Sequence, residues 1–104
     1  MAQFLLVVTS SALEGRDQAF NDWYDSVHLQ DMLDLPGVTS GRRYDALPQS
    51  PAPAPAKHLA IFELEAEDPL AVLGELGRRM EAGEVSGTTD IDPSSVKMWI
   101  YKPH

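Results

Sequence analysis

The chain has 104 residues, of which 43% are hydrophobic, and its 16 acidic and 8 basic residues give a formal net charge of −8. We expect one globular domain over residues 1–104. The acidic balance argues against nucleic acid or an anionic membrane surface as a partner, since both require clustered Lys and Arg. The chain lacks cysteine, a secretory pattern and an apolar run of membrane-spanning length, so we expect a cytoplasmic protein without disulfides.

The first half of the chain alternates between strand and helix patterns. Residues 3–9 (QFLLVVT) predict a strand that is apolar on both faces and therefore central in its sheet. Residues 16–33 predict a long helix, which the Pro36-Gly37 pair terminates. Residues 38–45 (VTSGRRYD) predict a more polar strand at a sheet edge. Residues 47–56 contain four prolines and predict an extended surface loop without regular structure.

The second half repeats the pattern. Residues 57–65 (KHLAIFELE) alternate as a strand, and residues 96–101 (VKMWIY) predict a fourth strand. Between them, Asp68 and the following proline predict the start of a second helix that ends near Gly83. The apolar stripe of this helix consists of Leu70, Leu73, Leu76 and Met80. Gly74 and Gly77 are expected to let its backbone approach the sheet closely.

The order of these elements is βαββαβ, which predicts an α+β, ferredoxin-like fold with two helices on one face of a four-stranded antiparallel sheet. The sheet face away from the helices is expected to be polar in such a fold. Here the first and fourth strands are apolar on both faces, so that face stays apolar, and a second copy is the simplest cover. We therefore expect a homodimer.

The predicted long helix carries a dense cluster of aromatic and titratable side chains. Phe20, Trp23, Tyr24 and Val27 share one stripe, and His28 follows Tyr24 by four residues, so the last two side chains can meet. The segments FNDWYDSVHL (20–29), LDLPGV (33–38) and RRY (42–44) resemble the EthD-like group of dimeric α/β-barrel proteins. Members of that group often have proline where this chain has Gln30, which leaves the local backbone after the histidine open.

The resemblance implies a homodimer whose two sheets close a barrel, with a small pocket between helix and sheet in each subunit. Relatives in the wider superfamily include cofactor-free monooxygenases, muconolactone isomerases and polyketide cyclases. It therefore implies a small cofactor-independent enzyme that acts by proton transfer on a carbonyl-containing or aromatic metabolite. The alternative hypothesis is a non-catalytic dimeric module that binds a small ligand or is purely structural.

The candidate catalytic residues are His28 and Tyr24. His28 titrates near neutral pH and can act as a general acid or base, or it can be a structural histidine bonded to a backbone carbonyl. Tyr24 can orient a substrate through its hydroxyl, or it can be a core residue. A histidine in a cavity favours catalysis, whereas a dry interior with the imidazole bonded to backbone favours a structural role.

The candidate substrate-binding residues are Trp23, Arg42 and Tyr44. Trp23 is a core residue or a pocket wall, and Tyr44 shares the strand face of Arg42. Arg42 and Arg43 lie on opposite faces, and the sequence does not decide which of them faces the pocket. The arginine that points inward needs an acceptor, either a substrate carboxylate or an acidic group of the partner subunit. The three scattered histidines have no metal-binding spacing, so we expect neither a metal nor a cofactor.

Overall fold

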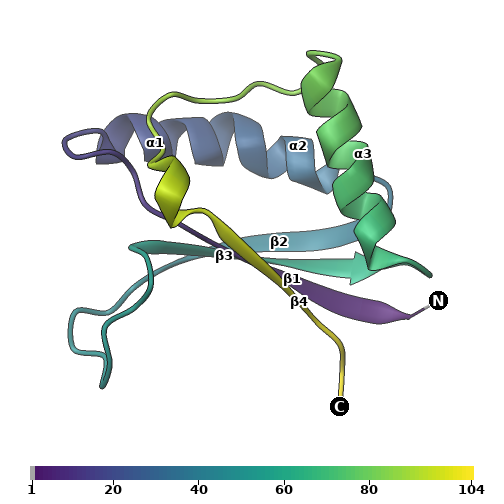
Figure 1. The fold of residues 1–104 in the computed structure, drawn as a ribbon, viewed down its shortest axis with the longest axis horizontal. Coiled ribbons are helices and arrows are strands. Elements are labelled where there is room, and N and C mark those ends of the chain that lie inside the picture. The colour runs from purple at the N-terminus through teal and green to yellow at the C-terminus, as the bar shows by residue number, and fades with distance from the viewer. Residues whose placement is uncertain (1) are drawn as a thin grey trace.

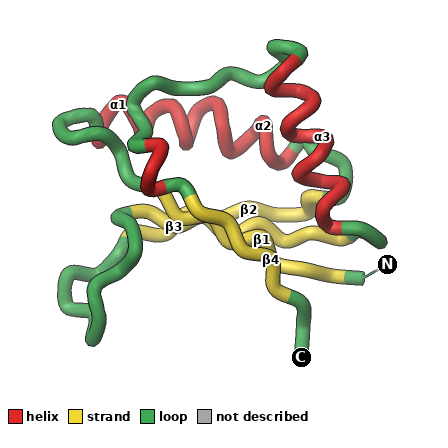
Figure 2. Tube along the Cα trace, in the orientation of Figure 1, coloured by secondary structure: helices red, strands yellow, loops and turns green. Residues whose placement is uncertain are grey.

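The computed structural model describes residues 2–104 and has the predicted order of elements. The strands are β1 (Gln3–Ser10), β2 (Val38–Asp45), β3 (His58–Glu65) and β4 (Lys97–Tyr101), and they form one antiparallel sheet in the order β2-β3-β1-β4. The helices are α1 (Asp17–Trp23), α2 (Leu29–Leu33) and α3 (Pro69–Glu81), all on the same face of the sheet (Figures 1 and 2). The predicted ferredoxin-like α+β fold is confirmed, with β2 at a sheet edge as its polar sequence indicated.

The alternation of β3 separates the two faces of the sheet. Its helix-facing side chains are buried, and Phe62 among them is fully buried. Phe62 pairs with Leu6 of β1 and with Gly41 of β2, so the edge strand β2 and the two central strands, β3 and β1, are in register at this level. The fully buried Phe20 of α1 completes the centre of the core from above.

One glycine sets how closely β2 approaches this core. A Cβ at Gly41 would lie 2.7 Å and 2.8 Å from two ring atoms of Phe62 and 3.4 Å from a methyl group of Leu29. Any side chain at this position would therefore push against a fully buried ring and the helix above it. The absence of a side chain at Gly41 lets the edge strand lie flat under α2.

The second predicted helix is confirmed at its start. Asp68 caps α3 by accepting a hydrogen bond from the Leu70 backbone N–H at 3.0 Å, with proline at the first helical position. The close approach predicted for Gly74 and Gly77 is wrong, because a Cβ at either position would have nothing within 4 Å. The predicted apolar stripe is wrong at its ends too, where Leu70 and Met80 are exposed, and the buried residue of α3 is Val72.

The connection from β2 to β3 contains the predicted proline-rich loop, residues 47–56, and has no helix or strand. It projects from the end of the sheet away from the helices (Figure 1). None of the helices in residues 2–104 is both long and apolar enough to cross a membrane.

Candidate functional site

The predicted long helix is continuous from Asp17 to Leu33, but its middle is not α-helical. A π-helical turn, η1 (Tyr24–His28), lies between α1 and α2, and the Leu29 N–H donates to the Tyr24 carbonyl five residues back. The Ser26 hydroxyl donates to the carbonyl of Asp22, the acceptor that a regular helix would give to the Ser26 N–H. The helix then continues through Gln30, which resolves the backbone question left open by the sequence.

The wide turn places His28 between two aromatic rings. Its imidazole stacks on the Trp23 indole, with ring centroids 4.6 Å apart and an interplanar angle of 16°. It also meets the Tyr24 ring edge-on at 4.8 Å and 89°. Tyr24 follows the expected four-residue spacing, whereas Trp23 is five residues away and would lie off this face in a regular α-helix. The π-turn thus creates the Trp23–His28 stack.

The ring nitrogens of His28 have no hydrogen-bond partner among residues 2–104, and neither is among the fully buried polar atoms without a partner. A structural histidine is expected to be bonded to backbone or to a carboxylate, so this geometry argues against that role. Burial of the side chain lowers the pKa of His28 below its ordinary value of 6.5, and the negative charge of Asp31 opposes this shift in part. His28 is therefore a neutral imidazole at pH 7.

Tyr24 is buried and acts as the second wall of this site. Burial raises the pKa of Tyr24 to about 12, and the positive charge of Arg43 opposes the rise in part. The phenol is therefore protonated at neutral pH, and its hydroxyl makes no hydrogen bond within residues 2–104. It is a hydrogen-bond donor without an acceptor in the protein.

Arg43 supports the Tyr24 ring from the side of the sheet. Its guanidinium lies 4.5 Å from the Tyr24 ring centroid, and it donates to Asp25 at 2.7 Å and to Asn21 at 2.8 Å. Of the two arginines left open by the sequence, Arg43 is the one that faces the helix. Two of its five N–H donors are engaged, by Asp25 and Asn21, so these contacts tie the guanidinium to the helix.

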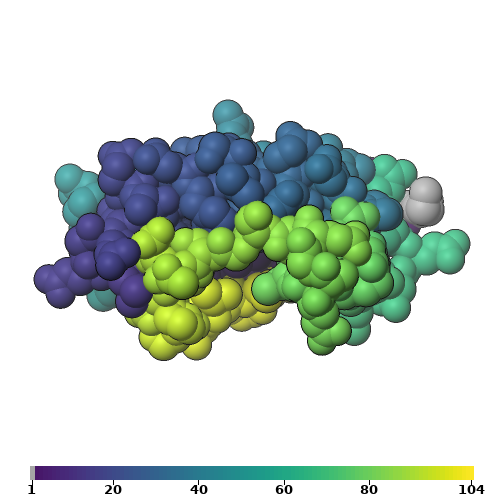
Figure 3. Space-filling model, turned by 90° about the horizontal axis from the view of Figure 1, so that it is seen from above, coloured from purple at the N-terminus to yellow at the C-terminus, as the bar shows by residue number. Residues whose placement is uncertain are grey.

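Trp23 connects the helix to the segment after α3. Its indole N–H donates to the Ser86 carbonyl at 3.2 Å. In the view onto the helices, a hollow opens between this segment, α3 and β4 (Figure 3). Met98 of β4 pairs with Val8, which places it on the helix-facing side of the sheet, yet 49% of it is exposed.

Arg42 and Tyr44 do not lie with His28. They pair with Ile61 and Leu59, on the sheet face away from the helices. There they border a groove of about 390 Å³. They are therefore separated from His28 by the sheet, because the alternation of β2 turns Arg43 towards the helix and both of its neighbours away from it.

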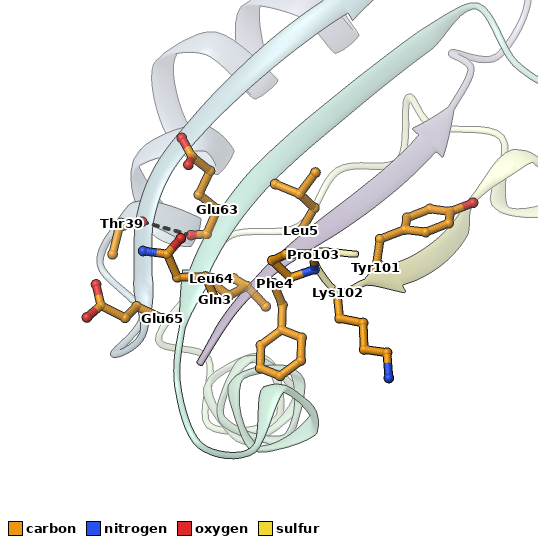
Figure 4. A pocket seen from close by; sticks show the side chains of 10 residues that line it. All are labelled: Gln3, Phe4, Leu5, Thr39, Glu63, Leu64, Glu65, Tyr101, Lys102 and Pro103. Carbon is orange, nitrogen blue, oxygen red and sulfur yellow. Dashed lines mark hydrogen bonds between the residues drawn. The ribbon is translucent and has the colours of Figure 1, made fainter. Parts of the chain in front are cut away.

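The sheet face without helices remains uncovered and apolar. Its exposed large side chains are Leu5, Tyr44, Trp99 and Tyr101. A second groove of about 310 Å³ lies at one end of this sheet, where the C-terminal residues Lys102 and Pro103 reach the side chains of β1 and β3 (Figure 4). It contains none of the predicted site residues. No cluster of three or more metal-binding side chains occurs in the part of the chain that the structure describes.

Comparison with known proteins shows the fold. A protein from Shewanella loihica PV-4, provisionally described as a monooxygenase, superposes with a TM-score of 0.67 at 13% identity, covering 99% of this chain and 95% of its own. An ethyl tert-butyl ether D (EthD) family protein from Bacillus halodurans C-125 superposes with a TM-score of 0.60 at 12% identity, over the full length of both chains. No family model and no curated protein sequence matches the chain.

The chain therefore has the fold of an EthD family protein, as the resemblance of its helix motif predicted. At these identities the likeness extends to the fold alone. Sequence reasoning had not assigned Arg43 its place under Tyr24, nor the role of Asn21 as its acceptor. The alternation of β2 left two arginines equivalent, and only the position of the helix distinguishes them.

Proposed function

We propose that this protein is a small enzyme that transfers a proton at a carbon next to a carbonyl group of a planar, uncharged metabolite. His28 is the general base, and Tyr24 is the hydrogen-bond donor to the oxygen that becomes negative. The observation that carries the proposal is the His28 imidazole, flanked by Trp23 and Tyr24 and without a hydrogen bond to the protein.

The base must be neutral and have a free lone pair before the reaction. Because burial lowers the pKa of His28, the imidazole is unprotonated at pH 7, and one of its nitrogens is available as an acceptor. When the substrate C–H bond breaks, the proton moves to this nitrogen and the electron pair moves into the carbonyl group to form an enolate. A positioned base of this kind contributes about 10²–10⁴ to the rate.

The donor must stay protonated while the base is not. With a pKa of about 12, the Tyr24 phenol keeps its proton throughout the neutral range and can donate to the enolate oxygen. Burial thus shifts the two pKa values in opposite directions, down for His28 and up for Tyr24. At neutral pH one group is a hydrogen-bond acceptor and the other a donor. Isomerisation, cyclisation and reaction with oxygen can all proceed from such an enolate.

The surroundings favour an uncharged aromatic or conjugated ligand. Trp23 provides a flat aromatic wall beside His28, and the exposed Met98 adds apolar surface on the helix-facing side of β4. The cation beside Tyr24, Arg43, is already paired with Asp25 at 2.7 Å, which disfavours a carboxylate substrate at this position.

The proposal includes a homodimer. Trp99, Tyr101, Leu5 and Tyr44 leave an apolar sheet face that water contacts in the single chain. Covering it with the same face of a second copy removes this area from water at about 25 cal/mol per Å². The two helix layers, with their His28 sites, then lie on the outside of the pair.

Proton transfer can be tested without knowing the final product. A panel of enolisable ketones and phenolic compounds is incubated with the protein in D₂O, and loss of the α-proton signal is followed by NMR. We expect enzyme-dependent exchange for at least one planar compound, a fall of about 10²–10⁴ in His28→Gln, and a smaller fall in Tyr24→Phe. The control is His104→Gln, which removes an exposed histidine at the C-terminus.

The alternative, a non-catalytic ligand-binding module, has a different outcome. A panel compound would then bind and shift the Trp23 or His28 resonances, while its α-proton exchanges no faster than in buffer. Exchange that is equal in the wild type and in His28→Gln would also overturn the proposed role of the imidazole.

A further inference from the structure

Asp31 lies one helical turn after His28, at a spacing of three residues that places both side chains on the same side of the helix. One of its carboxylate oxygens, Oδ2, is fully buried and has no hydrogen-bond partner. Among residues 2–104, only one other buried side-chain atom, Nε2 of His58, shares this condition.

A buried carboxylate oxygen without a donor is unfavourable, because desolvation of the charge is not compensated. No arginine or lysine donates to this oxygen among residues 2–104. Arg43 donates to Asp25 and Asn21, and Arg78 and Arg79 of α3 are bonded to Glu75. Asp31 therefore has an unused hydrogen-bond acceptor, its buried Oδ2 atom.

His28 is the complementary group. Among residues 2–104 its ring nitrogens have no hydrogen-bond or ion-pair partner, so they are not bonded to the Asp31 carboxylate in the neutral state. Proton uptake by His28 converts both ring nitrogens into donors. One of them then needs an acceptor in a partly buried site, and Asp31 is the acidic side chain whose charge acts on this imidazole.

We propose that Asp31 is the positioning residue of the site: its carboxylate accepts an N–H of the His28 imidazolium when His28 has taken the substrate proton. This inference rests on the proposed function of His28. The proton passes from the substrate carbon to one ring nitrogen of His28, the electron pair stays on the enolate, and Asp31 accepts a hydrogen bond from the other ring nitrogen without itself being protonated. The negative charge of Asp31 stabilises the imidazolium and fixes which nitrogen faces the substrate.

The charged and titratable groups near His28 determine which substitution tests the role of Asp31. Tyr24 and Asp31 come from its own helix, Arg43 approaches from β2 behind the Tyr24 ring, and the segment after α3 contributes the Ser86 carbonyl to Trp23. Of these, Asp31 has the negative charge that raises the pKa of His28 against the effect of burial.

The test is an NMR titration of the His28 ring nitrogens in ¹⁵N-labelled protein, which reports both the pKa and the tautomer. Asp31→Asn is expected to lower the pKa of His28 further and to broaden the choice of tautomer, and Asp31→Glu to restore both in part. The matched control is Asp34→Asn at the C-cap of α2, an exposed carboxylate that accepts from Gln30 at 2.8 Å, and it should leave the His28 titration unchanged.

A purely structural Asp31 gives another pattern: Asp31→Asn would lower the melting temperature while the His28 titration overlays that of the wild type, and that result overturns the inference. If Asp31→Asn is too unstable for a titration, Asp31→Ser, which also removes the negative charge, is measured instead, and a titration curve identical to the wild type overturns the inference. These outcomes are independent of the proposed function, which fails if no panel compound shows enzyme-dependent α-proton exchange or if His28→Gln leaves that exchange intact.

Discussion

Gly41→Ala is expected to destabilise the fold where β2 packs against Phe62 of β3 and Leu29 of α2. The new methyl group would lie 2.7 Å and 2.8 Å from Phe62, whose ring is fully buried and has no free space to move into. Overpacking of this kind costs about 1–3 kcal/mol, and the lower backbone entropy of alanine in the unfolded chain offsets up to about 1 kcal/mol of that. The net loss corresponds to a fall in melting temperature of about 4–8 °C per kcal/mol.

The matched control is Gly74→Ala in the middle of α3, where a Cβ meets nothing within 4 Å. That change should stabilise the protein by about 0.5–1 kcal/mol, since glycine is unfavourable inside a helix. Urea and thermal unfolding of the two variants should therefore shift in opposite directions from the wild type. A Gly41→Ala variant as stable as Gly74→Ala would refute the reasoning, because it would mean that β2 and α2 separate at no cost.

Three further predictions concern the surface, the loop and the histidines. Trp99→Glu on the uncovered sheet face should convert a homodimer into a monomer with an unchanged far-UV circular dichroism spectrum, and sedimentation of the wild type as a monomer at micromolar concentration contradicts the dimer itself. Replacing residues 47–56 with a short glycine-containing turn should leave the melting temperature within a few degrees, whereas a large fall would show that the loop packs on the core or on the partner. Because the pKa of His28 is lower in the folded state, the unfolded chain binds its proton first, so wild-type stability should decline below about pH 6.5. In His28→Gln this decline should be shallower, and parallel stability curves for the two proteins would contradict the lowered pKa.

The fold could be predicted from the sequence because each signal was local. The alternation of β3, the Asp68-Pro69 helix start and the doubly apolar β1 depend on neighbours within a few residues, and all three were confirmed. The site was harder to predict from the sequence, since a helix pattern does not reveal a π-turn. The Ser26 hydroxyl donates to the Asp22 carbonyl at this turn, but a serine in a helix pattern is common and does not mark such a turn.

The errors have a common cause in tertiary geometry. Gly74 and Gly77 suggested close packing, but α3 approaches the sheet through Val72, and the glycine that permits contact is Gly41 in a strand. In the same way, residue types alone made Arg42 and Arg43 equal candidates. The position of Tyr24 above β2 decides between them, and that position depends on how the whole helix crosses the sheet.

The most direct test of the account is the pH dependence of α-proton exchange for a compound that the protein accepts. If neutral His28 is the base and protonated Tyr24 the donor, the rate rises with an apparent pKa below 6.5 and stays level through the neutral range. This rise should be absent in His28→Gln. A rate that falls as His28 loses its proton, or a pH profile shared by the wild type and His28→Gln, would contradict the assignment of the imidazole as the base.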